Sequence, residues 1–439
     1  MNTEIDVAPP FPPPAPTGEI PSPWFTDRGR QIRDRVRELA PLIRAQAQEG
    51  ERIRALTPEV LAALDDAGIY RMTMPFEWDG YALGARDLVE IIRALGEADG
   101  SAGWAGFVGV GLKNLLALDD AVVDEVRADT IGWVGPAVVG ASVFSTKVGS
   151  ATKAEGGWLV KGQWAFASGC QHAKWALVGV GFDPSVAGGT GRGVVLLERN
   201  QYDIVDDWDV MGLSGTASNS LRSVGEVFVP DHRFLDLVEY PARFARLHER
   251  YTGPAFQALG MSQLVSVSLA DVAIALGMSR GALASFAEQA CRRQPFSLPY
   301  PTVADMPSAQ VAAGKALAMT NAAAAVVESV ADQLDARSAA GLDFSPAEES
   351  EISLGVSYAA NLCDDAITLL QKTLGSSTIA SSNPIQRFVR DVRVLTSHGA
   401  IRLDPQAEQN GRRVLGLEPF AMFGGAVPQR RKEKEGAAR

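Results

Sequence analysis

The chain is short of the residues that build metal sites and disulfide frameworks. Its 439 residues include 3 cysteines and 4 histidines. Cys170, Cys291 and Cys363 lack metal-ligand spacing and are odd in number, which favours reduced thiols in a cytoplasmic protein. The histidines are few and scattered along the chain, so we expect no bound metal.

An excess of basic charge is also absent. The 41 Lys and Arg residues are outnumbered by 52 Asp and Glu residues, which gives a net charge of −11. Proteins that bind duplexes carry a basic face, so we expect no nucleic-acid partner, although a local basic groove for a phosphorylated substrate is compatible with this balance. No apolar run of membrane-spanning length is free of charges and helix breakers, and the N-terminus lacks the regions of a signal peptide. We therefore expect no membrane association.

The composition changes along the chain in a way that predicts domains. With 46% hydrophobic residues, the chain has enough apolar side chains for a large core. The order helical, β, helical predicts an α+β fold in which a β domain packs on helices, with a ligand site in the crevice between them. The predicted segments are a Pro-rich arm (1–22), a helical domain (23–130), a β domain (131–235), a helical bundle (236–425) and a basic tail (426–439).

Local signals predict several helices. Thr57 followed by Pro58 is a helix start, because Thr caps exposed N–H groups and Pro fits the first turn. An amphipathic helix is predicted over 85–98, and a nearly uncharged, buried helix over 103–118, where Lys113 is the single charged residue. Long helices are predicted over 264–289, 308–338 and 347–374.

Two glycine-rich stretches are the most informative part of the sequence. The first, GGWLVKGQWAFASGCQHA (156–173), predicts a β-hairpin that turns at Lys161-Gly162. The pattern breaks at Ser168-Gly169, which leaves a hydroxyl and bare backbone at a strand end and suits a flat ligand lying against main-chain donors. The second stretch is GLSGTASNS (212–220). Taken alone, the first stretch is equally compatible with an ordinary hairpin.

Taken together, four motifs resemble those of one fold family. From about residue 25 to 425 the chain resembles the acyl-CoA dehydrogenase fold, with its N-terminal helical domain, central β-barrel or sandwich domain and C-terminal four-helix bundle. It is more similar still to the monooxygenases of that fold that receive reduced flavin from a separate reductase. The motifs are GGWLVKGQWAFASG, GLSGTASNS with VFVP after it, Arg293-Gln294-Pro295-Phe296 with Gln310 downstream, and IQRFVRDVRVLTSHG (385–399).

The resemblance implies roles for individual residues. Ser168 would be catalytic near the flavin N5, and His398 would be an acid/base or a substrate contact. Each also has a structural alternative, as a strand-end hydroxyl and a packed imidazole. The residues implied in flavin binding are Trp164, Phe166, Ala167, Ser168, Thr216, Ser218, Asn219, Arg293, Phe296 and Gln310, and those implied in substrate binding are Trp104, Leu112, Lys113, Asn114 and His398.

The motif near the C-terminus separates two activities within this fold. An acyl-CoA dehydrogenase needs a carboxylate to remove the α-proton, commonly from a Tyr-Glu-Gly-Thr motif. Here Thr396-Ser397-His398-Gly399-Ala400 takes its place, and no Asp or Glu lies between Asp391 and Asp404. The resemblance therefore implies a monooxygenase in which reduced FMN, with FAD as the alternative, and O2 form a C4a-hydroperoxide, whose distal oxygen is transferred to the substrate. A dehydrogenase whose base lies elsewhere in the sequence is a further alternative.

The same resemblance implies a substrate and partners. Many phenol-hydroxylating members carry a His in the helix that corresponds to 104–118, and this chain has none there. An amine needs less help from a base, so we expect a nitrososynthase-type N-oxygenase that oxidises the amine of a dTDP-linked amino sugar. An aromatic hydroxylase is the alternative, and a non-catalytic flavin-binding protein is a reading from another class. No GxGxxG fingerprint follows a strand, so we expect a separate flavin reductase, and the resemblance implies a homotetramer.

Overall fold

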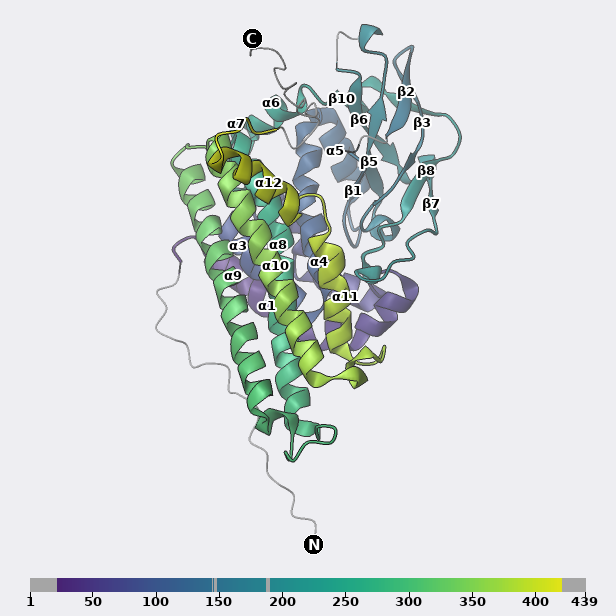
Figure 1. The fold of residues 1–439 in the computed structure, drawn as a ribbon. Helices are drawn as coiled ribbons and strands as arrows, with labels where there is room; N and C mark the ends of the chain where they lie inside the picture. Colours follow the sequence, from purple (N-terminus) through teal and green to yellow (C-terminus); the bar gives the residue numbers. More distant parts are fainter. Residues whose placement is uncertain (1–21, 144, 146–147, 187–189, 421–439) are drawn as a thin grey trace, which may run out of the picture.

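The computed structural model describes residues 22–143, 145, 148–186 and 190–420. The predicted basic tail and all but the last residue of the Pro-rich arm lie outside this part of the chain. Figure 1 shows the β strands to one side of the upper half of the molecule, with the long C-terminal helices running beside the N-terminal helices. The described chain thus follows the predicted order of helices, strands and helices.

The N-terminal helices are α1 (Asp27–Ile53), α2 (Pro58–Asp66), α3 (Ala85–Ala98), α4 (Gly100–Gly111) and α5 (Asp120–Asp129). As predicted, the Thr57 side chain caps α2, with Pro58 in its first turn, and α3 has the predicted bounds. The helix predicted over 103–118 is two elements instead, because α4 ends at Gly111 and the chain continues as the 3-10 helix η3 (Leu112–Ala117). Lys113 and Asn114 therefore lie on η3 and not on α4.

The β domain contains two sheets. The larger is ordered β10-β6-β5-β2-β3-β9, with β1 pairing β5 in parallel, and the smaller is ordered β4-β8-β7. The strands are β1 (Val138–Ala141), β2 (Gly149–Ala154), β3 (Gly157–Lys161), β4 (Gln163–Trp164), β5 (Trp175–Gly181), β6 (Arg192–Glu198), β7 (Tyr202–Val205), β8 (Ser220–Ser223), β9 (Val227–Pro230) and β10 (Phe234–Asp236).

The hairpin predicted at Lys161-Gly162 is wrong. Strand β3 pairs with β2 and β9, whereas β4 pairs with β8, so the chain passes from one sheet to the other at Gly162. A Cβ on Gly162 would lie 2.6 Å from the Gly149 Cα, so the two backbones approach too closely there for a side chain. The glycine is needed for this approach and not for a two-residue turn.

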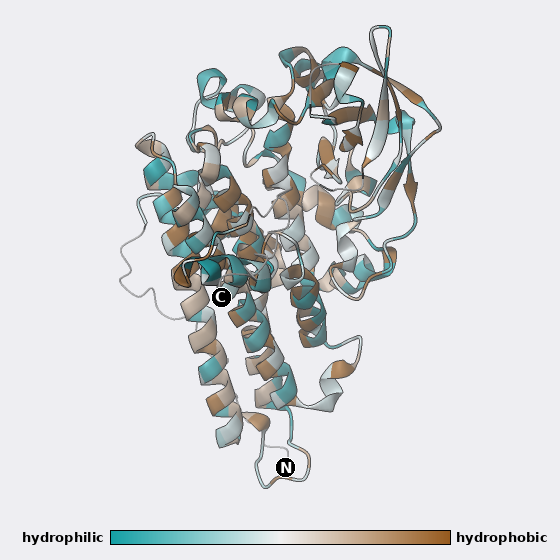
Figure 2. Cartoon of the chain, turned by 45° about the horizontal axis from the view of Figure 1, so that its top comes forward, coloured by the Kyte–Doolittle hydropathy of each residue, from teal (hydrophilic) through white to brown (hydrophobic). Residues whose placement is uncertain are grey.

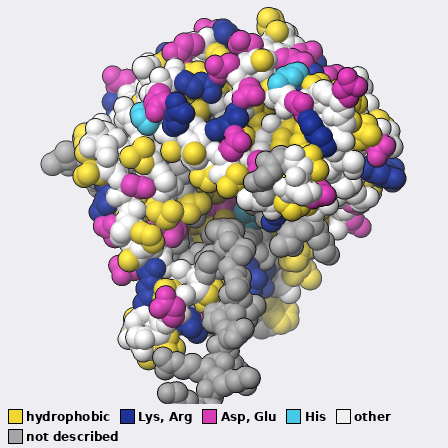
Figure 3. Space-filling model, turned by 90° about the horizontal axis from the view of Figure 1, so that it is seen from above, with side chains coloured by type: hydrophobic (Ala, Val, Ile, Leu, Met, Phe, Trp, Pro, Cys, Tyr) yellow, Lys and Arg dark blue, Asp and Glu magenta, His cyan; other side chains and the backbone are white. Residues whose placement is uncertain are grey.

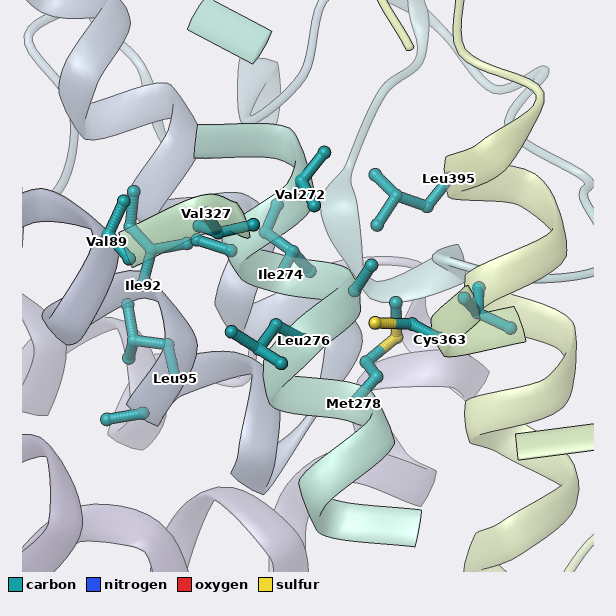
Figure 4. Close-up of a cluster of buried hydrophobic side chains, with 14 of the residues drawn as sticks. Val89, Ile92, Leu95, Val272, Ile274, Leu276, Met278, Val327, Cys363 and Leu395 are labelled. Carbon is teal, nitrogen blue, oxygen red and sulfur yellow. The ribbon is translucent and has the colours of Figure 1, made fainter. Parts of the chain in front are cut away.

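The C-terminal helices are α6 (Tyr240–Ala245), α7 (Leu247–Arg250), α8 (Gly260–Arg292), α9 (Pro307–Ala339), α10 (Pro346–Leu374), α11 (Pro384–Thr396) and α12 (Leu403–Val414). Hydrophobic and hydrophilic residues alternate along these helices (Figure 2), as expected when one face of each helix is buried. Figure 4 shows the core that they share with α3, where Ile92, Ile274, Leu276 and Cys363 lie in one cluster.

Helix α8 is the central element of this core. Among the described residues it is the one helix long and apolar enough to cross a membrane by length and composition, and 72% of its most apolar window is buried inside the protein. The molecular surface looks different from this core. On the face drawn in Figure 3, acidic and basic side chains are interspersed over the described residues, without a continuous basic stripe.

A buried polar junction joins the β domain to the helices. The backbone N–H of Leu213, in the second glycine-rich stretch, donates to Asp391 Oδ1 of α11 at 2.6 Å. Asp99 caps α4 by accepting from the N–H groups of Ser101 and Ala102, and its other oxygen lies 3.2 Å from Arg387 Nε. One junction therefore fixes the start of α4, helix α11 and the loop before β8 relative to one another.

The buried carboxyl groups of this junction should make the stability of the fold depend on pH. Burial, and then the charge of Asp99, raise the pKa of Asp391 above its ordinary value. The folded state thus holds a proton that the unfolded state releases, so this carboxyl stabilises the fold less as pH rises through that range. From about pH 5 to about pH 8, the unfolding temperature of the unaltered protein should therefore fall relative to that of Asp391→Asn, which has no carboxyl to titrate at this position.

Two further variants complete the test by thermal unfolding. The exposed control Asp203→Asn should follow the unaltered protein at every pH. Asp391→Leu leaves the Leu213 N–H buried without an acceptor and should lower the free energy of unfolding by about 1–3 kcal/mol. Parallel pH curves for Asp391→Asn and the unaltered protein would contradict this account of the junction.

Candidate active site

The two glycine-rich stretches meet at the edge of the β domain. The N–H of Ala167 donates to the Asn219 carbonyl at 3.1 Å, and the N–H of Gly169 donates to the Thr216 carbonyl at 2.9 Å. Their hydroxyls form a row, because the Ser218 Oγ lies 2.8 Å from the Ser168 Oγ and 2.7 Å from the Thr216 Oγ1. We call Ser168, Ser218 and Thr216 the hydroxyl row. All three groups are uncharged hydroxyls that can donate or accept hydrogen bonds.

An exposed aromatic ring precedes the hydroxyl row in the chain. The side chain of Phe166 is 70% exposed, and its backbone φ is +60°, which is unfavourable for a bulky residue. Its ring meets the Trp208 ring edge-on, with the centroids 6.0 Å apart. A strained backbone that presents an aromatic side chain to solvent is typical of a functional site. An aromatic surface followed by a row of hydroxyls fits a flat heterocycle with polar atoms along one edge.

The other flavin residues predicted in the β domain are buried, and their contacts with flavin stay predictions. Trp164 is fully buried and donates from Nε1 to the Gly179 carbonyl at 2.6 Å, so its ring belongs to the β-domain core and does not share the exposed surface of Phe166. Ala167 is also buried and contributes its backbone. Asn219 accepts from Gln171 Nε2 and donates to the Val205 carbonyl, which holds the second stretch in place.

The third predicted motif lies elsewhere in the chain's own fold. Figure 1 shows the turn between α8 and α9 at the end of the bundle away from the β domain. Phe296 on this turn is 95% exposed, Arg293 reaches the Leu374 carbonyl, and Gln310 donates to the Ala304 carbonyl. One chain therefore does not bring these three residues to the hydroxyl row. A contribution to the site of another copy of the chain stays a prediction.

His398 is held by a buried carboxylate. Its Nδ1 lies 3.2 Å from Oδ2 of Asp271, whose side chain is fully buried on α8. Burial would lower the pKa of His398, but the hydrogen bond with Asp271 and the charge of that carboxylate outweigh burial and raise the pKa. The imidazole packs edge-on against Trp104 and Phe107 of α4, with ring centroids 5.5 and 6.3 Å away. The arrangement is an imidazole oriented by a carboxylate against the aromatic surface of α4, which is compatible with the predicted acid/base role.

A small pocket lies where α4 packs on the β domain. Trp104 of α4 forms one side, and His172, which follows the first glycine-rich stretch, forms another. Neither Trp104 Nε1 nor His172 Nε2 has a hydrogen-bond partner among the described residues, and both atoms are buried. The pocket is lined by Leu56, Tyr70, Ser101, Trp104, Ala105, Val108, Pro136, Gly169, His172, Gly215 and Thr216.

The remaining predicted substrate residues have protein partners. Leu112 is buried in a hydrophobic cluster. Asn114 accepts from the hydroxyl of Tyr240 at 2.6 Å, so its side chain fastens η3 to α6. Lys113 is 7% exposed, donates to Gln263 Oε1 at 3.2 Å and lies over the ring of Phe244. Contacts of Lys113 and Asn114 with a substrate stay predictions.

Sequence reasoning missed Asp271 and His172. Asp271 had a signal, because it is the one charged residue between Gly260 and Ser279, and a lone carboxylate in an apolar core helix is costly to bury unless it has a partner. His172 lies inside the quoted first stretch but carries no spacing cue. Its proximity to Trp104 results from the packing of α4 on the β domain.

The geometry can be compared with known proteins. Residues 269–403 match the family described as the acyl-CoA dehydrogenase C-terminal domain. The chain is 30% identical over 389 residues to the oxygenase subunit HsaA of a flavin-dependent monooxygenase from Mycobacterium tuberculosis (strain CDC 1551 / Oshkosh), covering 88% of this chain and 95% of that one. It is 28% identical over 410 residues to the oxygenase component of an FADH(2)-dependent resorcinol hydroxylase from Rhizobium sp. (strain MTP-10005), covering 92% and 98%.

Solved structures agree with the fold. The crystal structure of the HsaA monooxygenase from M. tuberculosis matches with a TM-score of 0.78 at 28% identity, covering 90% of this chain and 99% of that one. XiaF from a Streptomyces species, solved with FADH2 and glycerol, matches with a TM-score of 0.80 at 23% identity, covering 90% and 97%, and supports the fold alone. These matches confirm the predicted fold class.

The buried ammonium of Lys113 predicts a second pH effect. Burial lowers the pKa of Lys113 to about 8, so between that pH and the ordinary lysine value of about 10.4 the unfolded chain holds a proton that the folded one lacks. The stability of the unaltered protein should therefore rise with pH relative to Lys113→Met. We expect Lys113→Met to unfold at a higher temperature than the unaltered protein near pH 7 and to lose this advantage by about pH 10.

Lys161→Met, at an exposed position, is the matched control. A less stable Lys113→Met protein near pH 7 would show instead that the ammonium stabilises the fold.

Proposed function

Since the chain belongs to the oxygenase components of two-component flavin-dependent monooxygenases, we propose that it hydroxylates a phenolic substrate with reduced flavin supplied by a separate reductase. Ser168, Ser218 and Thr216 fit the polar edge of the flavin ring system, and Phe166 fits its apolar surface. When bound, the reduced flavin together with O2 supplies the oxygen atom that enters the substrate. Either FMN or FAD is compatible with these residues.

The observation that carries the proposal is the pairing of His398 with Asp271. A phenol becomes a good carbon nucleophile when it loses its proton, and an imidazole with one nitrogen held by a carboxylate has the other free to accept it. Trp104 and Phe107 give this imidazole an aromatic neighbouring surface that suits an aromatic ring. His398 thus removes the phenol proton, the role that a histidine in α4 would otherwise have.

N-oxygenation of a dTDP-linked amino sugar is the second candidate. The observation in its favour is that α4 and η3 contain no histidine, which suits an amine substrate. The relatives described above have names that point to flavin-dependent oxygenation and to resorcinol, and neither name mentions an amino sugar. We therefore place the nitrososynthase activity, and a role in antibiotic biosynthesis, behind the aromatic hydroxylase.

Two further proposals concern the setting of the enzyme. Exposed apolar side chains on α9 and α10, with Val311 and Tyr358 each 55% exposed and Leu317 51% exposed, are compatible with a homotetramer packed through these helices. Reduced thiols at Cys170, Cys291 and Cys363 are compatible with a cytoplasmic location. Gel filtration tests the first proposal, and a monomer would contradict it.

A coupled assay tests the activity. The protein is mixed with a flavin reductase, NADH, FMN or FAD, and O2, and is offered resorcinol and other phenols or, separately, a dTDP-linked amino sugar. A phenol product that has gained one oxygen atom supports the hydroxylase. Oxygen gained at the amine supports the second candidate, and turnover of neither class together with oxidation of an acyl-CoA would contradict both.

The His398–Asp271 pair predicts the pH dependence of that activity. His398→Gln should lower kcat by about 10²-fold or more while leaving flavin affinity unchanged, because general base catalysis is worth this much. The matched control is His232→Gln, a partly exposed histidine in the β domain. In Asp271→Asn, burial of His398 continues while the favourable charge is lost, so the acidic limb of the kcat/KM profile should move to lower pH. An unmoved acidic limb would show that His398 is not the base.

A further inference from the structure

Two residues that line the pocket between α4 and the β domain each have a buried ring nitrogen without a hydrogen-bond partner in the described part of the chain. Trp104 is 9% exposed, and its Nε1 can only donate a hydrogen bond. Burial lowers the pKa of His172, so its ring is neutral near pH 7, and its Nε2 donates or accepts according to the tautomer. Buried polar atoms in proteins are almost always hydrogen-bonded, so two orphans on one pocket indicate a missing partner.

The walls of the pocket determine which partner fits. Leu56, Ala105, Val108 and Pro136 are apolar, and no Lys, Arg, Asp or Glu is among the lining residues. An ionised group would lose its hydration there without gaining an opposite charge, which is costly. An uncharged oxygen atom can accept from Trp104 Nε1 and also meet His172 Nε2, as a hydroxyl or as a carbonyl.

The pocket also lies next to the proposed acid/base. The Trp104 ring contacts the His398 ring at a centroid distance of 5.5 Å and also lines the pocket. A substrate held beside His398 therefore has Trp104 within reach of its other substituents. Gly169 and Thr216 line the same pocket, so it adjoins the hydroxyl row as well.

We propose that Trp104 and His172 form a specificity pocket for an uncharged oxygen substituent, a hydroxyl or a carbonyl, on the aromatic substrate. This inference rests on the proposed function, because it assigns the pocket to the substrate of the same site. The preferred substrates are then phenols that carry a second oxygen substituent without charge. Phenols with a carboxylate at that position are disfavoured.

The test compares ligands that differ in one group. Dissociation constants are measured by calorimetry, with oxidised flavin present and without turnover, for resorcinol, 3-hydroxyacetophenone, 3-methylphenol and 3-hydroxybenzoate, and for the corresponding 4-substituted phenols. The unaltered protein should bind the hydroxyl or carbonyl ligand about five- to ten-fold more tightly than the methyl ligand, as for one neutral hydrogen bond. The carboxylate ligand should bind more weakly than either oxygen ligand.

Two variants assign the preference to the pocket. Trp104→Phe keeps an aromatic ring but removes Nε1, and His172→Phe removes Nε2, so each should bring the oxygen-to-methyl ratio close to one. Trp78→Phe, which removes an indole that does not line the pocket, should keep the ratio of the unaltered protein. Using both pocket variants keeps the test valid if one of them fails to fold.

The outcomes separate this inference from the proposed function. An unchanged ratio in both pocket variants, or no preference in the unaltered protein, would overturn the specificity pocket and indicate that the nitrogens meet only water. A loss of flavin affinity in Trp104→Phe with an unchanged ratio would assign the nitrogens to the flavin and overturn it as well. Absence of hydroxylated product from every phenol would contradict the proposed function, while the binding ratios would still report on the pocket.

Discussion

The hydrogen bond from the Leu213 N–H to the buried Asp391 carboxyl group is the contact on which the arrangement of the site depends. It ties the loop that carries Thr216 and Ser218 to α11, and Asp99, at the start of α4, is linked to the same helix through Arg387. The hydroxyl row comes from the β domain, whereas His398 and Trp104 come from helices. Their spacing is therefore set by this junction and not by any single element.

Much of the fold could be predicted because the signals are local. The cap at Thr57, the bounds of α3 and the three long helices α8, α9 and α10 follow from spacing along one segment. The hairpin at Gly162 was wrong because strand pairing is not local. Gly-rich turns look alike whether the chain reverses within one sheet or moves to another, and only the approach of Gly149 decides between the two at this position.

In the candidate site too, features with a local sequence signal could be predicted and features created by packing could not. That Ser168, Thr216 and Ser218 lie together could be predicted, because they belong to the two motifs expected to form one site, whereas their contact with flavin stays a prediction. Trp164 could not be distinguished from Phe166, since residues two apart on one strand share a face. In the structure β4 ends at Trp164 and Phe166 has a backbone φ of +60°, so the chain has left the strand before Phe166. The lone carboxylate of Asp271 could have been noticed, but its pairing with His398 and the shared pocket of His172 and Trp104 could not be predicted, because helix packing creates both. The absence of a histidine in α4 pointed to an amine, whereas the proposed function assigns the base for a phenol to a histidine outside α4.

The separation of the hydroxyl row from α4 has a consequence for how such an enzyme changes its repertoire. The residues proposed to fit the cofactor lie on the β domain, while Trp104, Ala105 and Val108 lie on one short helix held at its first turn by Asp99. Variation on α4 is confined to the side chains that line the pocket, because a Cβ at Gly103, Gly106 or Gly109 would lie less than 3.0 Å from neighbouring atoms. One scaffold can acquire new chemistry targets by exchanging a few residues on a single helix.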